Sequence, residues 1–191
     1  LPQISHLSVI DRYHWESVTL ISFILLNTAH PLDFKDKFVM SMNYIFGKGV
    51  ASVLPLDKLE FSFSKRTGRL KSVMVKNKLL ATLRSDGSIA ITVYCADILI
   101  KYPLFLENCI VVKDGPDIFV SKGRSVFAKH VVSCGDRVKP TSDVAILNEK
   151  GKVIGVGRAI LSAKMIRAFN IGVAVKVRES INRTTEGKVN A

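Results

Sequence analysis

Three consecutive residues, Lys122, Gly123 and Arg124, have the composition of a phosphate-binding loop. Lys and Arg side chains neutralise phosphate oxygens, and flexible backbone at a glycine can turn its N–H groups toward the same anion. The alternative is an ordinary β-turn whose charged side chains are solvated. Of all the segments in the chain, we expect this one to make the strongest single contact with a phosphate backbone.

Two aromatic residues flank that loop, Phe119 before it and Phe127 after it. An exposed ring can stack on an unpaired base or wedge against the end of a base-paired stem. The spacing predicts that one of the two rings lies in the core. We expect Phe119 to be the exposed one.

A second group of cations lies within and just after a predicted hairpin turn at residues 65–68. Lys65, Arg66 and Arg69 belong to it, and Lys71 follows. Such a cluster often serves solubility alone. The whole chain, however, has 28 Lys and Arg against 16 Asp and Glu, with a formal charge of +12 and a pI of about 9.8. This excess favours a polyanionic partner, so we expect the hairpin to contact nucleic acid.

Neither an enzyme centre nor a metal site is indicated. The three cysteines, Cys95, Cys109 and Cys134, are too widely spaced for a C-x-x-C zinc motif and odd in number for a disulfide framework. The sequence has no P-loop, dinucleotide fingerprint, nucleophile elbow or H-E-x-x-H pair. We therefore expect no catalytic residue, no metal and no cofactor, and a reducing, cytoplasmic location.

One apolar stretch stands out, at residues 18–29. It is shorter than the roughly 20 residues that a membrane-spanning helix needs, and neither a basic segment before it nor an A-x-A site after it marks a signal peptide. We expect no membrane association. The stretch is typical of a helix that is covered either by the core or by a partner protein.

The remaining pattern predicts an α+β fold in two parts. In the first part, a helix at residues 35–46 precedes an antiparallel meander of four strands, because apolar and polar residues alternate between turn signals. In the second part, short strands and one short helix form a small closed β-structure. The predicted meander strands are residues 59–64, 69–75, 79–84 and 89–93. The second part has strands at residues 143–147 and 153–159, a helix at residues 162–169, and terminal strands at residues 109–112 and 174–177 that pair to close the barrel.

Four segments of the second part resemble the PUA domain in content and order. They are CIVVKD from Cys109, FVSKGRSVFAKHVV from Phe119, VAILNEKGKVIGVGRAILSAKMI from Val144 and GVAVKVRES from Gly172. In the first part, MNYIFGKGVASVLP, SKRTGRLKSV, LLATLRSDGSIAIT and ADILI resemble the module that precedes the PUA domain in archaeosine tRNA-guanine transglycosylases and archaeosine synthases. The resemblance implies a pre-PUA α+β module at residues 34–106 and a PUA β pseudo-barrel at residues 107–180. The residue pattern alone predicts a helical extension at residues 1–33 and a polar tail at residues 181–191.

The resemblance also implies a function and more contact residues. In that family both modules grip the acceptor end of tRNA, so Lys129, Arg158, Lys176 and Arg178 are expected to extend the RNA-binding surface. The family's catalytic barrel has no counterpart in these residues. We therefore expect a non-catalytic tRNA-binding subunit that serves a separate catalytic chain. The alternatives are an assembly subunit without RNA contact, and an enzyme that acts on RNA by itself.

The sequence departs from the PUA pattern in two places. Residues 139–143 stand where a Pro-Gly-Asp turn is common, and Lys129-His130-Val131 stands where Lys-Phe-Val is usual. The second change puts a titratable ring near the expected RNA face.

Overall fold

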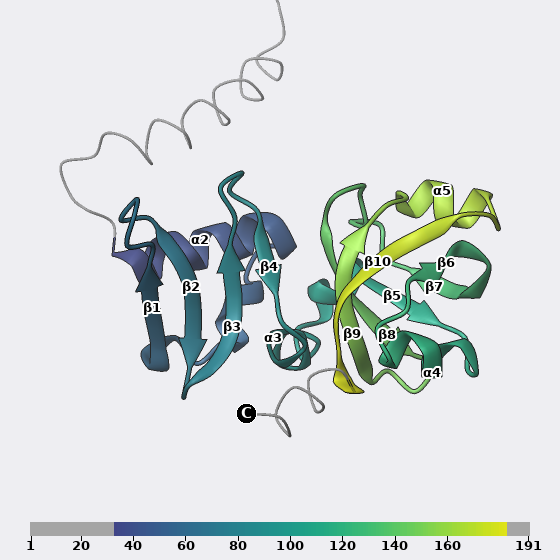
Figure 1. Ribbon diagram of the computed structural model, residues 1–191, viewed down its shortest axis with the longest axis horizontal. Helices are drawn as coiled ribbons and strands as arrows, with labels where there is room; N and C mark the ends of the chain where they lie inside the picture. The colour runs from purple at the N-terminus through teal and green to yellow at the C-terminus, as the bar shows by residue number, and fades with distance from the viewer. Residues whose placement is uncertain (1–32, 183–191) are drawn as a thin grey trace, which may run out of the picture. The chain divides into compact units, whose positions relative to one another are not determined.

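The computed structural model describes residues 33–182, which contain two sheets (Figure 1). The extension predicted for residues 1–33 lies outside the described residues except for Asp33, and most of the predicted tail does so as well. The observed class is α+β, as the sequence predicts.

The first sheet is the predicted meander of four antiparallel strands in the order β1-β2-β3-β4. Lys76 and Asn77 join β2 to β3 with φ values of 49° and 59°, which fit a two-residue hairpin turn that follows the twist of the strands. The strands are β1 (Leu59–Phe63), β2 (Leu70–Val75), β3 (Lys78–Leu83) and β4 (Ile89–Ile91).

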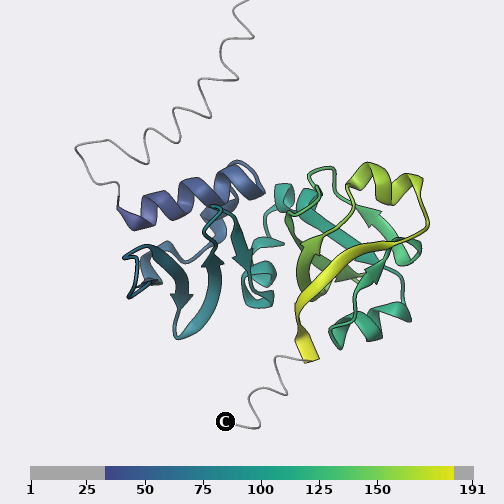
Figure 2. The ribbon, with the colours of Figure 1, turned by 45° about the horizontal axis from the view of Figure 1, so that its top comes forward.

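Helix α2 (Phe34–Phe46) lies across one face of this sheet (Figure 2). Its buried residues Phe38, Met42 and Phe46 recur every four positions, so they form one apolar stripe toward the strands. The prediction of a helix over residues 35–46 is confirmed. Two short 3-10 helices, η1 (Val50–Val53) and η2 (Leu56–Lys58), lead from α2 to β1.

The fourth strand is shorter than predicted because a helix begins within the expected range. Thr92 takes an extended conformation, and its side chain accepts a hydrogen bond from the Cys95 N–H at 3.2 Å, which caps α3 (Val93–Leu99). Alternation in residues 89–93 does not distinguish the last strand residues from a helix cap. A 3-10 helix, η3 (Pro103–Asn108), then leads to the second sheet.

The second sheet has six strands in the order β6-β10-β9-β8-β5-β7. The prediction that residues 109–112 pair with residues 174–177 is wrong. Strand β5 lies between β7 and β8, and β10 lies between β6 and β9, so both edges of each strand are occupied by other partners. The strands are β5 (Cys109–Val112), β6 (Val126–Phe127), β7 (Val131–Cys134), β8 (Asp143–Asn148), β9 (Val153–Ala159) and β10 (Val173–Ser180).

Three short helices complete this nearly closed, barrel-like sheet. The predicted one is α5 (Ala163–Ala168), and its cap is Ser162, whose side chain accepts from the Met165 N–H at 3.3 Å. Helix α4 (Pro116–Ser121) and the 3-10 helix η4 (Ala128–His130) were not predicted, although Pro116 is a recognisable first helical residue.

The apolar residues form two clusters, and the first extends beyond the first sheet. Cys109, Leu147, Val153 and Val156 of the second sheet are buried together with the side chains of α2, α3 and the meander. Ile181 packs against both clusters. The two sheets are therefore joined by shared apolar packing.

Candidate nucleic-acid interface

The end of α4 carries the predicted phosphate-binding loop. The Gly123 N–H donates to the Val120 carbonyl at 2.8 Å and the Arg124 N–H donates to the Phe119 carbonyl at 3.0 Å. With a φ of 88° at Gly123, this is a Schellman end, in which glycine takes the left-handed position that closes the helix.

This geometry changes how the loop can bind an anion. The N–H groups of Lys122, Gly123 and Arg124 all donate to carbonyls of α4, so the expectation that they turn toward a phosphate is wrong. The side chains of Lys122 and Arg124 are exposed. The loop therefore offers two cations on a rigid turn.

Both aromatic rings beside the loop are exposed. Phe119 on α4 is 63% exposed and Phe127 on β6 is 45% exposed. The prediction that one of them lies in the core is wrong, because the buried positions are taken by Val120 and Val126. The Phe127 ring stands edge-on to His130, with ring centroids 6.5 Å apart.

Two of the predicted cations face each other on the outer side of the second sheet. Arg158 on β9 and Lys176 on β10 are cross-strand partners, and both are exposed. The Arg158 Nε also donates to the Thr141 carbonyl at 3.1 Å.

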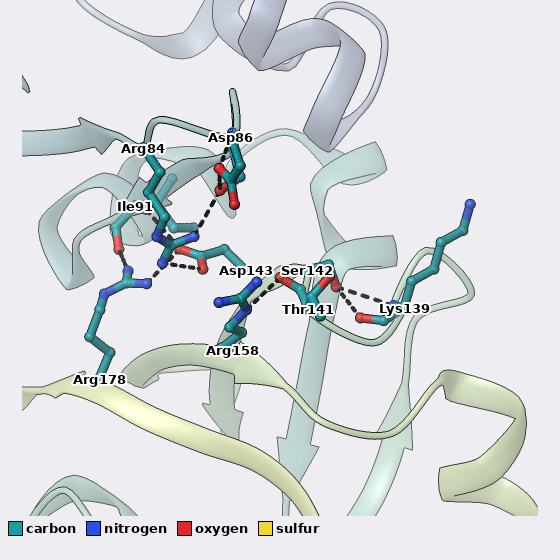
Figure 3. Close-up of polar contacts among 10 residues, drawn as sticks. Arg84, Asp86, Ile91, Lys139, Thr141, Ser142, Asp143, Arg158 and Arg178 are labelled. Atoms are coloured by element: carbon teal, nitrogen blue, oxygen red, sulfur yellow. Dashed lines mark hydrogen bonds and ion pairs between the residues drawn. The ribbon is translucent and has the colours of Figure 1, made fainter. Parts of the chain in front are cut away.

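Arg178 belongs to an ion cluster that the sequence did not reveal (Figure 3). Its Nη1 lies 2.7 Å from the Asp143 carboxylate, and its Nη2 donates to the Ile91 carbonyl. Arg84, at the end of β3, lies 3.1 Å from the same carboxylate. The Ile91 N–H donates to it as well, at 3.1 Å. Asp143 is thus a buried acceptor for three donors. Two of them, the Arg84 side chain and the Ile91 N–H, belong to the β3–β4 hairpin of the first sheet.

A second carboxylate, that of Asp86, lies in the turn between β3 and β4 (Figure 3). The hydroxyl and N–H of Ser88 both donate to Asp86, and these bonds hold the pKa of Asp86 below its ordinary value. Arg84 and Arg158 lower that pKa further through their charge. Asp86 is therefore ionised beside the basic residues at neutral pH.

The remaining predicted cations are all exposed. Lys65, Arg66 and Arg69 lie at the turn between β1 and β2, where the Ser64 N–H donates to the Arg69 carbonyl at 2.9 Å. Lys129 lies in η4 beside His130. The predicted residues thus occupy separate places in the fold: the end of α4 with β6 and η4, the outer face of β9 and β10, and the β1–β2 turn.

Two of the three cysteines, Cys95 and Cys109, are not disposed as nucleophiles. Burial raises the pKa of the Cys109 thiol to about 12 and raises that of Cys95 as well. Within residues 33–182, no three His, Cys, Asp or Glu side chains are grouped so as to hold a metal ion. None of the helices in that same range is both long and apolar enough to cross a membrane.

Comparison with known families covers both sheets. Residues 40–103 match the patch-forming domain C2 of tRNA-guanine transglycosylase, and residues 108–181 match the PUA domain. The chain consists largely of a C2 domain followed by a PUA domain. The C2 domain holds the meander and α3, and the PUA domain holds the six-stranded sheet.

Relatives of both domains together occur in archaea. The tRNA-guanine(15) transglycosylase of Methanosphaera stadtmanae is 30% identical over 179 residues, which is 91% of this chain and 26% of that enzyme. The enzyme of Methanocaldococcus jannaschii is 33% identical over 139 residues, 72% of this chain and 21% of that enzyme. The chain is homologous to the C-terminal regions of these enzymes and spans about a quarter of their length.

Solved structures share the fold. A hypothetical protein from Pyrococcus horikoshii superposes with a TM-score of 0.61 at 25% identity, and the match covers 85% of this chain and 99% of that one. A conserved PUA domain protein from Thermoplasma acidophilum superposes with a TM-score of 0.56 at 18% identity, covering 75% and 86%. The second similarity concerns the fold alone.

Proposed function

We propose that this chain is a non-catalytic tRNA-binding module that grips the acceptor end of tRNA for an archaeosine-type tRNA-guanine transglycosylase or a related tRNA-modifying enzyme. The observation that carries the proposal is the end of α4 in the PUA domain, where the side chains of Lys122 and Arg124 and the ring of Phe119 are all exposed. The homology to tRNA-guanine(15) transglycosylases supports tRNA as the RNA.

Binding at this loop depends on the two cationic side chains. The C-terminal end of a helix carries a partial negative charge, which disfavours an anion, and the loop N–H groups are already bonded. Lys122 and Arg124 must therefore supply the attraction for phosphate. Counterion release then makes the affinity strongly dependent on salt.

The aromatic ring supports contact with the end of the RNA. Phe119 is 63% exposed on the helix that carries the loop. Aromatic rings stack readily on unpaired bases, and the acceptor end of tRNA finishes in unpaired nucleotides. Ring and cations together would hold a single-stranded end beside a phosphate backbone.

We propose that the chemistry is performed by a separate catalytic chain. The support is that the thiols of Cys95 and Cys109 are buried with raised pKa values and are therefore not poised as nucleophiles. In this arrangement the C2 and PUA domains supply affinity, and the catalytic chain supplies the reacting groups.

The experiment is the affinity of the purified chain for whole tRNA and for tRNA without its CCA end, each at two salt concentrations. A Lys122→Ala/Arg124→Ala variant is expected to bind more weakly, and its slope of log affinity against log salt is expected to fall by about two. A Lys58→Ala/Lys150→Ala variant removes the same charge from exposed positions elsewhere and serves as the control.

The alternative function is an assembly subunit that contacts protein and not RNA. It is favoured by the apolar side chains around the α5–β10 connection, where Phe169 is 57% exposed and Ile171 is 84% exposed. Equal affinity for tRNA with and without its CCA end, or no binding, would count against the acceptor-end proposal and favour this alternative.

A further inference from the structure

The contact between the C2 and PUA domains has an apolar part. Helix α3 of the C2 domain packs against β9 of the PUA domain, and Val153 and Val156 of β9 are buried in the same cluster as Ala96 and Leu99 of α3. Apolar contacts are strong but not directional. By themselves they allow one domain to rock or slide on the other.

The contact also has a polar part, and this one is directional. The Asp143 carboxylate of the PUA domain accepts from Arg84 and from the Ile91 N–H, which lie on either side of the β3–β4 turn of the C2 domain. Arg178 of the PUA domain completes the link, since it bonds both Asp143 and the Ile91 carbonyl. The hairpin is therefore held at both of its strand ends.

The polar link between the two domains depends on one carboxylate, that of Asp143. The side chain of Asp143 is 2% exposed, whereas those of Arg84 and Arg178 are 25% and 34% exposed. Two guanidinium groups from different domains share one anion. Without that anion they would repel each other across the contact, and their partial exposure allows water to enter between them.

We propose that Asp143 is a positioning residue that fixes the orientation of the C2 domain on the PUA domain, so that the basic loops of both domains meet one RNA at a set spacing. The inference rests on the proposed RNA binding. When two binding surfaces are held at a fixed spacing, the second contact forms at a high effective concentration, and this advantage is lost when the geometry varies.

The substitution Asp143→Asn distinguishes a positioning role of Asp143 from a purely electrostatic effect on RNA binding. Asp143→Asn keeps the shape of the side chain and makes the chain more positive, so electrostatics alone predicts tighter RNA binding. Positioning predicts weaker binding, by about tenfold or more for whole tRNA. Asp57→Asn is the matched control, since it makes the same charge change at a side chain that is 96% exposed.

The test uses the full chain with Cys134→Ser and spin labels at Thr67→Cys in the β1–β2 turn and Asp114→Cys in the β5–α4 connection. We expect one narrow distance distribution in the parent chain and in Asp57→Asn, and a broad one in Asp143→Asn. The affinity for whole tRNA should fall in Asp143→Asn, while the affinity for a CCA trinucleotide, which is too short to reach the basic loops of both domains, should stay unchanged.

A narrow distribution and undiminished tRNA affinity in Asp143→Asn would overturn the inference. If Asp143→Asn fails to fold, Arg84→Gln tests the orientation through the distance distribution alone, because it cuts the link from the C2 side and leaves the Asp143–Arg178 pair within the PUA domain. Its tRNA affinity does not enter the test, since the loss of a positive charge weakens RNA binding by itself. A parent chain that binds no tRNA would refute the proposed function instead, and the distance distributions would still decide whether Asp143 fixes the orientation.

Discussion

Arg158 and Lys176 lie directly opposite each other on β9 and β10, so two positive charges share one cross-strand position. Like charges at such a position destabilise a sheet. The nearby carboxylate of Asp143 is already bonded to Arg84 and Arg178. The ionised Asp86, whose pKa Arg158 lowers through its charge, offsets part of the repulsion, and the proposed RNA phosphate would offset more of it.

The first prediction concerns this pair. Lys176→Glu should convert the repulsion into an ion pair with Arg158 and raise the free energy of unfolding by about 0.5 kcal/mol. The same change should weaken RNA binding. Urea unfolding and a tRNA titration measure the two effects, with Lys150→Glu at an exposed turn as control. A variant that is both more stable and equally tight in binding would contradict a role of this strand pair in RNA contact.

The second prediction concerns stability at the domain contact. Asp143→Ala leaves two guanidinium groups without their shared carboxylate and should lower the free energy of unfolding by about 3 kcal/mol. Asp57→Ala, which removes the partner of Lys35 at an exposed site, should change it by less than about 1 kcal/mol. Chemical denaturation of both variants gives the comparison. Equal losses would show that the buried cluster contributes no more than a surface pair.

The strands and long helix were predictable because each rests on local pattern. Alternation predicts the meander, and Asp33 as a helix cap with Gly47 at the helix end predicts the helix over residues 35–46. Which strands of the second sheet lie next to each other was not predictable from local sequence pattern. Residues 109–112 and 174–177 are both apolar, and nothing local states that β8 lies beside β5 or that β9 lies beside β10.

The third prediction concerns the exposed ring on α4. Phe119→Ala should leave stability nearly unchanged, because the ring is 63% exposed, and should weaken binding of RNA with an unpaired end by about 1–3 kcal/mol. Phe169→Ala is the matched control, because it removes a ring that is 57% exposed directly after the end of α5. Equal effects of the two variants, or none, would argue against stacking at Phe119.

The fourth prediction concerns the thiols. Iodoacetamide at pH 8 should modify Cys134, which is partly exposed, well before Cys95 and Cys109, whose pKa values are raised by burial. Mass spectrometry of the native and the unfolded chain counts the labels. Early labelling of Cys95 in the native chain would contradict its burial.

The same thiols give a pH dependence. In the folded chain the pKa of Cys109 is raised to about 12, so this thiol stays protonated where the unfolded chain has lost the proton. Its contribution to stability is complete below about pH 8.5 and declines as pH rises toward the folded pKa. Thermal unfolding between pH 8 and pH 11 should show the decline, and Cys109→Ala should reduce it.

Sequence reasoning located the candidate interface in part. The exposed cations of the α4 loop and the β1–β2 turn follow from composition and turn signals. The Asp143 cluster does not, because Arg84 and Asp143 are 59 positions apart and each looks like an ordinary charged residue at a strand end. An aspartate that opens an otherwise apolar strand was the available signal, and its partners became evident from the fold.

The apolar packing that joins the two sheets has a consequence for how such chains can be recombined. The matched families meet between residues 103 and 108, yet Cys109, Leu147, Val153 and Val156 beyond that point are buried with the first cluster. A PUA domain that is transferred to another protein without the C2 domain would expose these apolar side chains to water. In this chain the unit that can be exchanged between proteins, by evolution or by design, is the pair of domains.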